Sequence, residues 1–458
     1  MNMSKHLTTW RLSAVVAVSV AFIATTASRA AVEQAQQPSA VSLVISGGDA
    51  GTPPRYAVPD FVALTPDASE IAKTLGQVLW DDLNFEREFY MIPRDTYNSI
   101  PAARTPEQVP FDRWRELGAD AVVFGTVQRT GNDVRVQVRL FNVRSRQSVF
   151  AKEYSGSANN PRLYAHTISD EIHDQQRGLK GVARTKLAWV SDRDGVRLGD
   201  TVENRQVKEI YYGDYDGANQ RRVTVGRRLN LNPSWSPDTR ALAYTTFRPS
   251  PDVFVSLIYQ GVLQNPTKGI GTNYLPVFSP DGKQIAFMSG RDGNPEIYAM
   301  NVDGSNLRRL TNTQAGDSSP TWSPSGSQIA FTSDRTGKAQ IYVMNSADGS
   351  GVRRLTVNES EADRPTWSPP PFNEIAYAAS TGPGYDIKVL VVSTGEVKQL
   401  TFGEGSNEGP AWAPGGRHLA FTSTRAGGRT QVFTIGRDGR GLRQITREGN
   451  NQTPAWSN

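Results

Sequence analysis

The sequence predicts an α+β protein in which an N-terminal mixed α/β domain is followed by a six-bladed β-propeller. A chain of 458 residues is too long for one ordinary core, so two domains are expected. Its 41 glycines and 28 prolines favour many short strands joined by turns. A short motif ending in an aromatic residue also recurs at nearly constant spacing along the C-terminal part of the chain.

The first thirty residues have the pattern of a secretory signal peptide. Lys5 and Arg11 precede an apolar run over residues 12–27, and the small residues Ser28 and Ala30 follow it. An uncleaved membrane anchor is the alternative, but the run is shorter than the ~20 apolar residues that span a bilayer and contains Ser and Thr. We therefore expect a signal peptide over residues 1–30 and no membrane insertion after its removal.

Composition excludes several kinds of site. The chain has no cysteine, which excludes disulfides, thiolate metal sites and cysteine nucleophiles. Residues 1–30 carry three bases and no acids, so their removal lowers the net charge from +5 to +2. The remaining bases are scattered between acids, so we expect no nucleic-acid partner.

Residues 31–181 are expected to form the α/β domain. A strand over residues 41–45 precedes Gly47 and Gly48, and a helix begins at Pro66 with its apolar residues at helical spacing. The further elements expected are strands over 89–92, 121–127, 134–143 and 148–154, and helices over 111–117 and 161–176.

Residues 182–458 contain the repeat that predicts the propeller. Its aromatic residues are Trp235, Phe278, Trp322, Trp367, Trp412 and Trp456, which are 43, 44, 45, 45 and 44 residues apart. Each is preceded two residues earlier by proline. Four strand-sized segments recur in a period, for example at 276–278, 284–289, 296–300 and 307–311, with Asp-Gly turns between them. Four antiparallel strands in about 44 residues are typical of a propeller blade.

The blades are expected to close into a ring through the two ends of the repeat region. Trp456 begins a sixth inner strand just before the last residue, while residues 186–191, 207–212 and 221–225 resemble a blade without its inner strand. We expect these fragments to complete each other. The aromatic residues should pack between blades, and proline at the start of each inner strand is tolerated because that strand is an edge lining the channel. Less regular strands are expected near Pro266 and at residues 369–371.

Three stretches of the chain resemble the TolB family of bacterial envelope proteins. They are residues 113–125, 163–172 and 178–190, the last reading Gly-Leu-Lys-Gly-Val-Ala-Arg-Thr-Lys-Leu-Ala-Trp-Val. The resemblance implies a monomeric, non-enzymatic protein of the periplasm that belongs to the Tol-Pal system. That system couples an inner-membrane motor to the outer membrane during cell division. It also implies two protein partners, a Pal-like peptidoglycan-associated lipoprotein at the propeller and a TolA-like protein at the N-terminal segment.

Candidate binding residues follow from propeller topology and from this resemblance. Loops that lead into inner strands and loops between second and third strands open at the same end of a propeller. The candidates there are Thr272, Asn273, Tyr274, Leu275, Asp317, Ser318, Asp363, Arg364, Asn407, Glu408, Arg193, Arg291 and Arg335. The resemblance adds Val41, Leu43, Val44 and Ile45, whose strand edge could pair with a partner's sheet. An ordinary edge strand of its own domain is the alternative for this segment.

Enzymatic sites are not evident in the sequence. His166 and His173 are seven residues apart on one predicted helix face, but no third metal ligand accompanies them, and His418 is expected to be structural. Residues 214–217 fall short of a calcium loop, and no Gly-x-Ser-x-Gly motif is present. We expect no cofactor. A secreted propeller hydrolase or carbohydrate-binding protein that uses the central channel remains the alternative.

Overall fold

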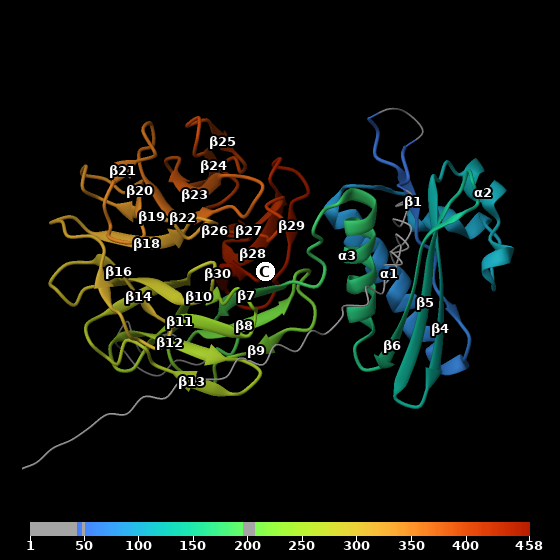
Figure 1. The fold of residues 1–458 in the computed structure, drawn as a ribbon, viewed down its shortest axis with the longest axis horizontal. Coiled ribbons are helices and arrows are strands. Elements are labelled where there is room, and N and C mark those ends of the chain that lie inside the picture. Colours follow the sequence, from blue (N-terminus) through green and yellow to red (C-terminus); the bar gives the residue numbers. More distant parts are fainter. Residues whose placement is uncertain (1–43, 48–50, 196–206) are drawn as a thin grey trace, which may run out of the picture. The chain divides into compact units, whose positions relative to one another are not determined.

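The computed structural model describes residues 44–47, 51–195 and 207–458, in which an α/β domain precedes a β-propeller (Figure 1). The expected signal peptide, together with Val41 and Leu43, lies outside the described residues. Among the residues that are described, none of the helices has the length and apolar character needed to span a bilayer.

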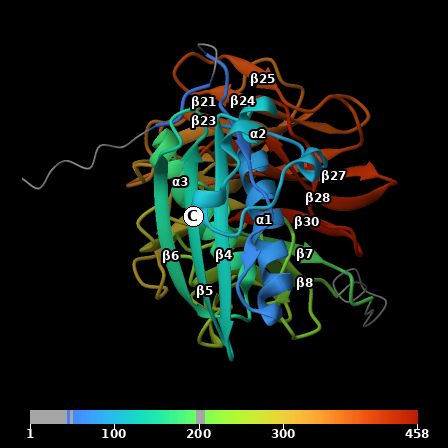
Figure 2. The same cartoon turned by 90° about the vertical axis from the view of Figure 1, so that its right-hand side faces the viewer.

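One six-stranded sheet forms the centre of the α/β domain. Its strands are β1 (Arg55–Ala57), β2 (Val62–Ala63), β3 (Tyr90–Met91), β4 (Ala121–Thr130), β5 (Asp133–Asn142) and β6 (Ser148–Ser157). The order is β3-β1-β4-β5-β6, with β2 also paired to β4. Strand β1 pairs in parallel with β3 and β4, and β2 pairs in parallel with β4. The pairs β4–β5 and β5–β6 are antiparallel, and these three strands lie side by side in Figure 2.

Helices cover both faces of this sheet. The long helices α1 (Ser69–Glu86) and α3 (Pro161–Arg177) share a core with Val123, Val136 and Leu140 on one face. On the other face, α2 (Phe111–Glu116) contributes Trp114 to a smaller core. Three short 3-10 helices complete the domain: η1 (Pro66–Ala68), η2 (Arg94–Ser99) and η3 (Pro106–Gln108). The helices and strands expected from residue 66 to residue 176 are confirmed to within a few residues at their ends.

Six four-stranded antiparallel sheets form the propeller. Blade 1 contains β10 (Asn230–Trp235), β11 (Ala241–Phe247), β12 (Pro251–Leu257) and β13 (Val262–Gln264). Blade 2 contains β14 (Asn273–Phe278), β15 (Gln284–Ser289), β16 (Glu296–Asn301) and β17 (Arg308–Arg309). Blade 3 contains β18 (Asp317–Trp322), β19 (Gln328–Ser333), β20 (Gln340–Asn345) and β21 (Arg353–Arg354).

The remaining blades follow the same plan. Blade 4 contains β22 (Ala362–Trp367), β23 (Glu374–Ser380), β24 (Tyr385–Val391) and β25 (Val397–Gln399). Blade 5 contains β26 (Asn407–Trp412), β27 (His418–Ala426), β28 (Arg429–Gly436) and β29 (Arg443–Gln444). Blade 6 contains β30 (Asn451–Trp456), β7 (Lys186–Ser191), β8 (Glu209–Asp214) and β9 (Arg221–Arg222).

Blade 6 confirms the expected ring closure, because its inner strand comes from the other end of the repeat region. Strand β30 pairs antiparallel with β7, with Trp456 opposite Leu187. Beyond the strand, the Ser457 backbone N–H donates to the Lys186 carbonyl at 2.9 Å, and the Trp456 indole donates to the Thr185 hydroxyl at 2.7 Å. The ring is therefore closed by non-covalent contacts alone.

The position of proline in the inner strands differs from expectation. Each inner strand begins three residues before its proline and ends, rather than begins, at the aromatic residue. In β14 the pairing with β15 is interrupted between Tyr274 and Val277, so Pro276 falls in a bulge. A bulged residue needs no ladder hydrogen bond, which explains why proline is tolerated there.

The repeated tryptophans pack between blades, as expected. Trp322 and Trp412 are each 7% exposed. Their indole N–H groups donate to carbonyls of the preceding blade, Val277 at 3.3 Å and Thr366 at 3.1 Å. Trp322 and Trp412 therefore join neighbouring blades through both apolar contact and a hydrogen bond.

Candidate protein-binding surface

One end of the propeller gathers both sets of loops from which the candidate residues were chosen. In every blade, a backbone hydrogen bond joins the loop leading into the inner strand to the end of the second strand or the loop that follows it. Examples are Gly290 to the Thr272 carbonyl at 3.0 Å and Ser380 to the Glu361 carbonyl at 3.0 Å. We call this end the propeller mouth.

Several candidate residues at the mouth bond to other residues of their own blade. In blade 2, the Arg291 guanidinium donates to Ser289 Oγ at 2.9 Å and to Asn273 Oδ1 at 3.1 Å. It also lies over the rings of Phe287 and Tyr298. We call this set an arginine bridge. Equivalent sets are Arg335 with Ser333 and Asp317, Arg425 with Ser423 and Asn407, and Arg193 with Ser191 and Asn451.

The arginine bridges reduce the number of candidates available to a partner. Asn273, Asp317 and Asn407 are completely buried, so they support the mouth without presenting a surface. Arg193, Arg291 and Arg335 are half-buried and already bonded within their blades. The other mouth candidates stay predictions: Thr272 and Glu408 are exposed, and Tyr274, Leu275, Ser318, Asp363 and Arg364 are half-buried.

The central channel contains a cavity of about 450 Å³, which lies toward the end opposite the mouth because its lining includes the turns after the inner strands, such as Pro237, Pro280 and Pro324. Inner-strand residues of all six blades line it, and Arg364 is the single charged residue among those lining residues. The residue before each inner-strand proline has a positive φ, including Leu275 at 54° and Arg364 at 53°. Positive φ is costly for residues other than glycine, so the bulges hold these side chains in fixed positions.

Exposed apolar residues at the mouth were missed by the sequence reasoning. Phe402 is 73% exposed and Val357 is 74% exposed, on the loops leading into β26 and β22. Thr401 donates to the buried carboxylate of Asp386 at 2.7 Å, and the Gly403 N–H donates to the same carboxylate at 3.0 Å. The backbone on both sides of Phe402 is thus fixed, and its side chain is exposed. The repeated Thr followed by an apolar residue was a visible signal, but sequence could not show which side chain was exposed.

Charge is unevenly distributed around the mouth. Blade 1 and the loop that leads into it present Arg227, Arg228 and Arg248, all exposed. Blades 4 and 5 present carboxylates, including the exposed Glu408 and Glu404, whose side chain is 75% exposed. Arg429 is an exposed base on this second side. Blades 1 and 4 lie opposite each other in a six-bladed ring, so the mouth has a basic side and an acidic side.

The N-terminal candidate segment differs from expectation. Val44 and Ile45 belong to no strand, because the Ile45 N–H donates to the side chain of Gln176 at 2.9 Å rather than to a neighbouring strand. Ile45 is 1% exposed and packs in the core of the α/β domain, whereas Val44 is 53% exposed. The expected strand is wrong at these two residues, and Ile45 offers no free edge to a partner.

No described residues form an evident metal centre: within 44–47, 51–195 and 207–458, no group of three or more His, Cys, Asp or Glu side chains is arranged to hold an ion. His166 and His173 do not face a common site. His166 lies beside two aspartates, and His173 lies near Glu86 and the Phe89 ring.

Comparisons with known proteins agree with this architecture. The family model described as the TolB beta propeller domain matches residues 174–458, and the TolB amino-terminal domain model matches residues 41–149. The Tol-Pal system protein TolB of Desulfosudis oleivorans is 33% identical over 260 residues, 56% of this chain and 57% of that protein. The Pseudomonas fluorescens protein of the same name is 32% identical over 243 residues, 51% of this chain and 52% of that protein.

The match thus spans about half the length of these curated relatives, whereas a structural comparison covers more. The crystal structure of TolB from Acinetobacter baumannii has a TM-score of 0.72 and 27% identity, covering 89% of this chain and 97% of that one. The family models, the relatives and this structure all agree, and the chain belongs to the TolB family.

Proposed function

We propose that this protein is a periplasmic, non-enzymatic and monomeric binding component of the Tol-Pal system. In this proposal the propeller mouth binds a Pal-like lipoprotein, and the N-terminal segment around residues 41–45 binds a TolA-like protein. The protein would link the two and so support outer-membrane integrity and its invagination during cell division. Family membership supports a Tol-Pal role, since the curated relatives are named as proteins of that system.

The observation that carries the proposal is the rigid, exposed and chemically mixed surface of the mouth. Arginine bridges and buried hydrogen bonds fix the loops before any partner arrives, so little conformational entropy is lost on binding. Phe402 and Val357 offer apolar anchors, and Glu404 and Glu359 stand two residues after them in the chain. Exposed apolar anchors beside polar and charged residues are typical of protein-binding sites.

The charges indicate the chemistry of the partner. The basic side at Arg227 and Arg228 and the acidic side at Glu404 and Glu408 favour a folded domain with the opposite arrangement. A nearly six-fold ring could otherwise accept such a domain in several rotational settings. Unequal charge around the mouth favours one of them.

The channel gives little support to the alternative of a hydrolase. A glycosidase would need two carboxylates near the scissile bond. No Asp or Glu is among the residues that line the described channel cavity, in which Arg364 is the charged side chain. The channel therefore supports the binding of a protein loop better than hydrolysis of a sugar.

The proposal can be tested with a soluble Pal domain and isothermal titration calorimetry. Phe402→Asp should weaken binding by tenfold or more, because an exposed apolar anchor is lost at a fixed position. Val397→Asp is the matched control, since Val397 is 42% exposed but begins an outermost strand at the opposite end of the blade. Absence of wild-type binding, or equal loss in both variants, would contradict binding at the mouth.

A further inference from the structure

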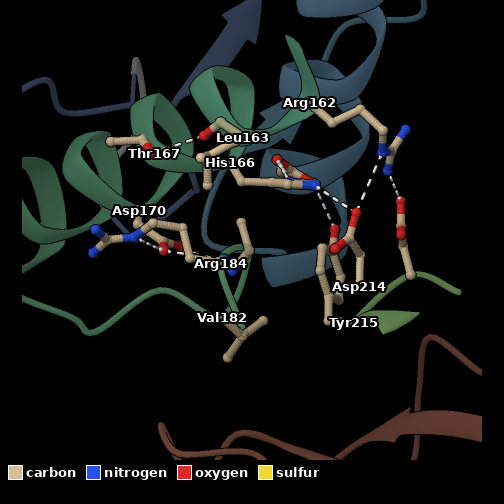
Figure 3. A network of polar contacts seen from close by, with 12 residues as sticks. Arg162, Leu163, His166, Thr167, Asp170, Val182, Arg184, Asp214 and Tyr215 are labelled. Carbon is tan, nitrogen blue, oxygen red and sulfur yellow. Dashed lines mark hydrogen bonds and ion pairs between the residues drawn. The ribbon is translucent and has the colours of Figure 1, made fainter. Parts of the chain in front are cut away.

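A buried polar cluster connects the α/β domain to blade 6. His166 Nδ1, on α3, lies 2.8 Å from Asp82 Oδ2 on α1. The other Asp82 oxygen accepts a hydrogen bond from the Tyr215 hydroxyl at 2.8 Å, and Tyr215 directly follows β8 of the propeller. Figure 3 shows His166 pointing from its helix toward Asp214 and Tyr215. Asp82 therefore bonds to both domains at once.

The second nitrogen of His166 faces a carboxylate of the propeller. Nε2 lies 3.6 Å from Asp214 Oδ2, at the end of β8. Asp214 also contacts the Lys186 ammonium, accepts from Asn219 at 2.7 Å and lies 3.6 Å from Nε of Arg162. Arg162 in turn pairs with Asp216. His166 thus has one aspartate on each ring nitrogen, one from each domain.

Because the cluster is buried, the protonation state of His166 decides how many hydrogen bonds its ring can donate to the two carboxylates. The side chains of His166, Asp82 and Asp214 are 2%, 0% and 2% exposed. A charged imidazole can donate from both nitrogens toward the two carboxylates, whereas a neutral one can donate from only one. Burial alone would lower the pKa of His166, but the carboxylates of Asp214 and Asp82 outweigh it and raise that pKa to about 9.

A second buried cluster at the same junction favours neutral rather than charged histidines. Arg417, in the turn between β26 and β27, pairs with the buried Glu86 of α1 at 2.7 Å. His173 and His418 lie in the field of this pair, together with Glu88, Asp170 and Arg87. Burial lowers the pKa of both histidines, against the attraction of Glu86. Neither ring nitrogen of His173 has a hydrogen-bond partner, so a charge there would be uncompensated.

We propose that this junction is a proton-controlled contact between the domains, closed when His166 is charged and His173 and His418 are neutral. A histidine with a raised pKa contributes fully below its ordinary value of about 6.5, and its contribution is lost as pH rises through about 9. Histidines with lowered pKa values contribute above about 6.5 and lose that contribution as pH falls. The two domains are therefore most firmly joined near neutral pH and separate more readily on either side.

The test measures the separation of the domains across pH. Because the chain has no native cysteine, Arg144→Cys in the α/β domain and Lys338→Cys in blade 3 provide two exposed positions for fluorescent labels. Energy transfer is recorded from pH 5 to pH 10, with circular dichroism at each pH to confirm that the propeller stays folded. The wild type should show a constant signal near neutral pH, an alkaline step near pH 9 and an acidic step below about pH 6.

Three variants show which histidine causes each step. His166→Gln should abolish the alkaline step and keep the acidic one, whereas His173→Phe should weaken the acidic step and keep the alkaline one. Asp214→Asn removes only the propeller carboxylate and should move the alkaline step to lower pH by about one unit, a tenfold change in proton affinity. If a variant does not fold, the ¹³C resonance of the His166 ring in the wild type gives its titration directly.

The proposal is overturned by any of three results. These are an alkaline step with an unchanged midpoint in His166→Gln, a wild-type signal that stays constant from pH 5 to pH 10, or a His166 resonance that titrates near pH 6.5. Binding of a Pal or TolA domain does not enter the measurement, so its outcome is independent of the function proposed above.

Discussion

Removal of residues 453–458 is predicted to destabilise the entire propeller, because these residues supply the inner strand of blade 6. Outside the strand ladder, the deletion eliminates four hydrogen bonds made by residues 455–457. They are Ser457 N–H to the Lys186 carbonyl, Lys186 N–H to Ser457 Oγ, the Trp456 indole to Thr185, and the Trp235 indole to the Ala455 carbonyl. At about 1 kcal/mol each they contribute roughly 4 kcal/mol.

The loss of Trp456 adds a similar amount. This side chain is 8% exposed, and truncation of a buried tryptophan costs about 4 kcal/mol. The total of roughly 8 kcal/mol is comparable with the 5–15 kcal/mol that stabilises a typical domain. We therefore expect the cooperative propeller transition to disappear or to fall by about 15 °C or more.

Differential scanning calorimetry of the full chain measures this effect, with far-ultraviolet circular dichroism to follow the β-structure. Deletion of Asn458 alone is the control, because this residue is exposed and lies beyond the closing contacts. A melting temperature within about 2 °C of the parent after removal of residues 453–458 would refute the view that this strand closes the ring.

Other variants test single contacts, each by urea unfolding of the propeller. Trp412→Phe should cost about 1 kcal/mol, because the indole hydrogen bond is lost while an aromatic ring stays between the blades, whereas Trp412→Ala should cost about 4 kcal/mol; no loss in Trp412→Phe would argue against the bond. Asp317→Asn should be tolerated, since blades 2, 5 and 6 have asparagine at this position of the arginine bridge. Asp317→Leu should instead cost about 3 kcal/mol, because it leaves Arg335 without its buried partner. Gly349→Ala should destabilise by more than 1 kcal/mol, because its φ is 74° and a Cβ would strike a backbone carbonyl; no loss would contradict the turn geometry.

Much of the fold could be predicted from sequence because it depends on local and periodic signals. Five near-equal spacings between aromatic residues determined the number of blades, and Asp-Gly turns marked their hairpins. The two halves of blade 6 were recognisable because each lacked what the other supplied. The helix that contains Leu75 and Val78 was evident from the same kind of periodicity, since one buried face requires helical spacing.

The candidate surface could be predicted only in part from such local and periodic signals. Topology indicated correctly which loops meet at the mouth, but not which of their side chains stay free. Arg291 and Phe402 illustrate the difference: the arginine is bonded inside its blade, and the phenylalanine is exposed. Such outcomes depend on neighbours that are tens of residues away in the chain. Ile45 was misassigned for the same reason, because its partner Gln176 is 131 residues distant.

The sequence by itself determined the repeat, the number of blades, the closing strand and the resemblance to TolB proteins. These features depend on which residue types occur at which spacing along the chain. Only the tertiary structure decided the charge state expected of His166, the burial of Asp82 and the contact between the two domains. Solvent exclusion and opposing charges arise when α1, α3 and β8 come together. Those forces depend on distance in space, which sequence spacing does not give.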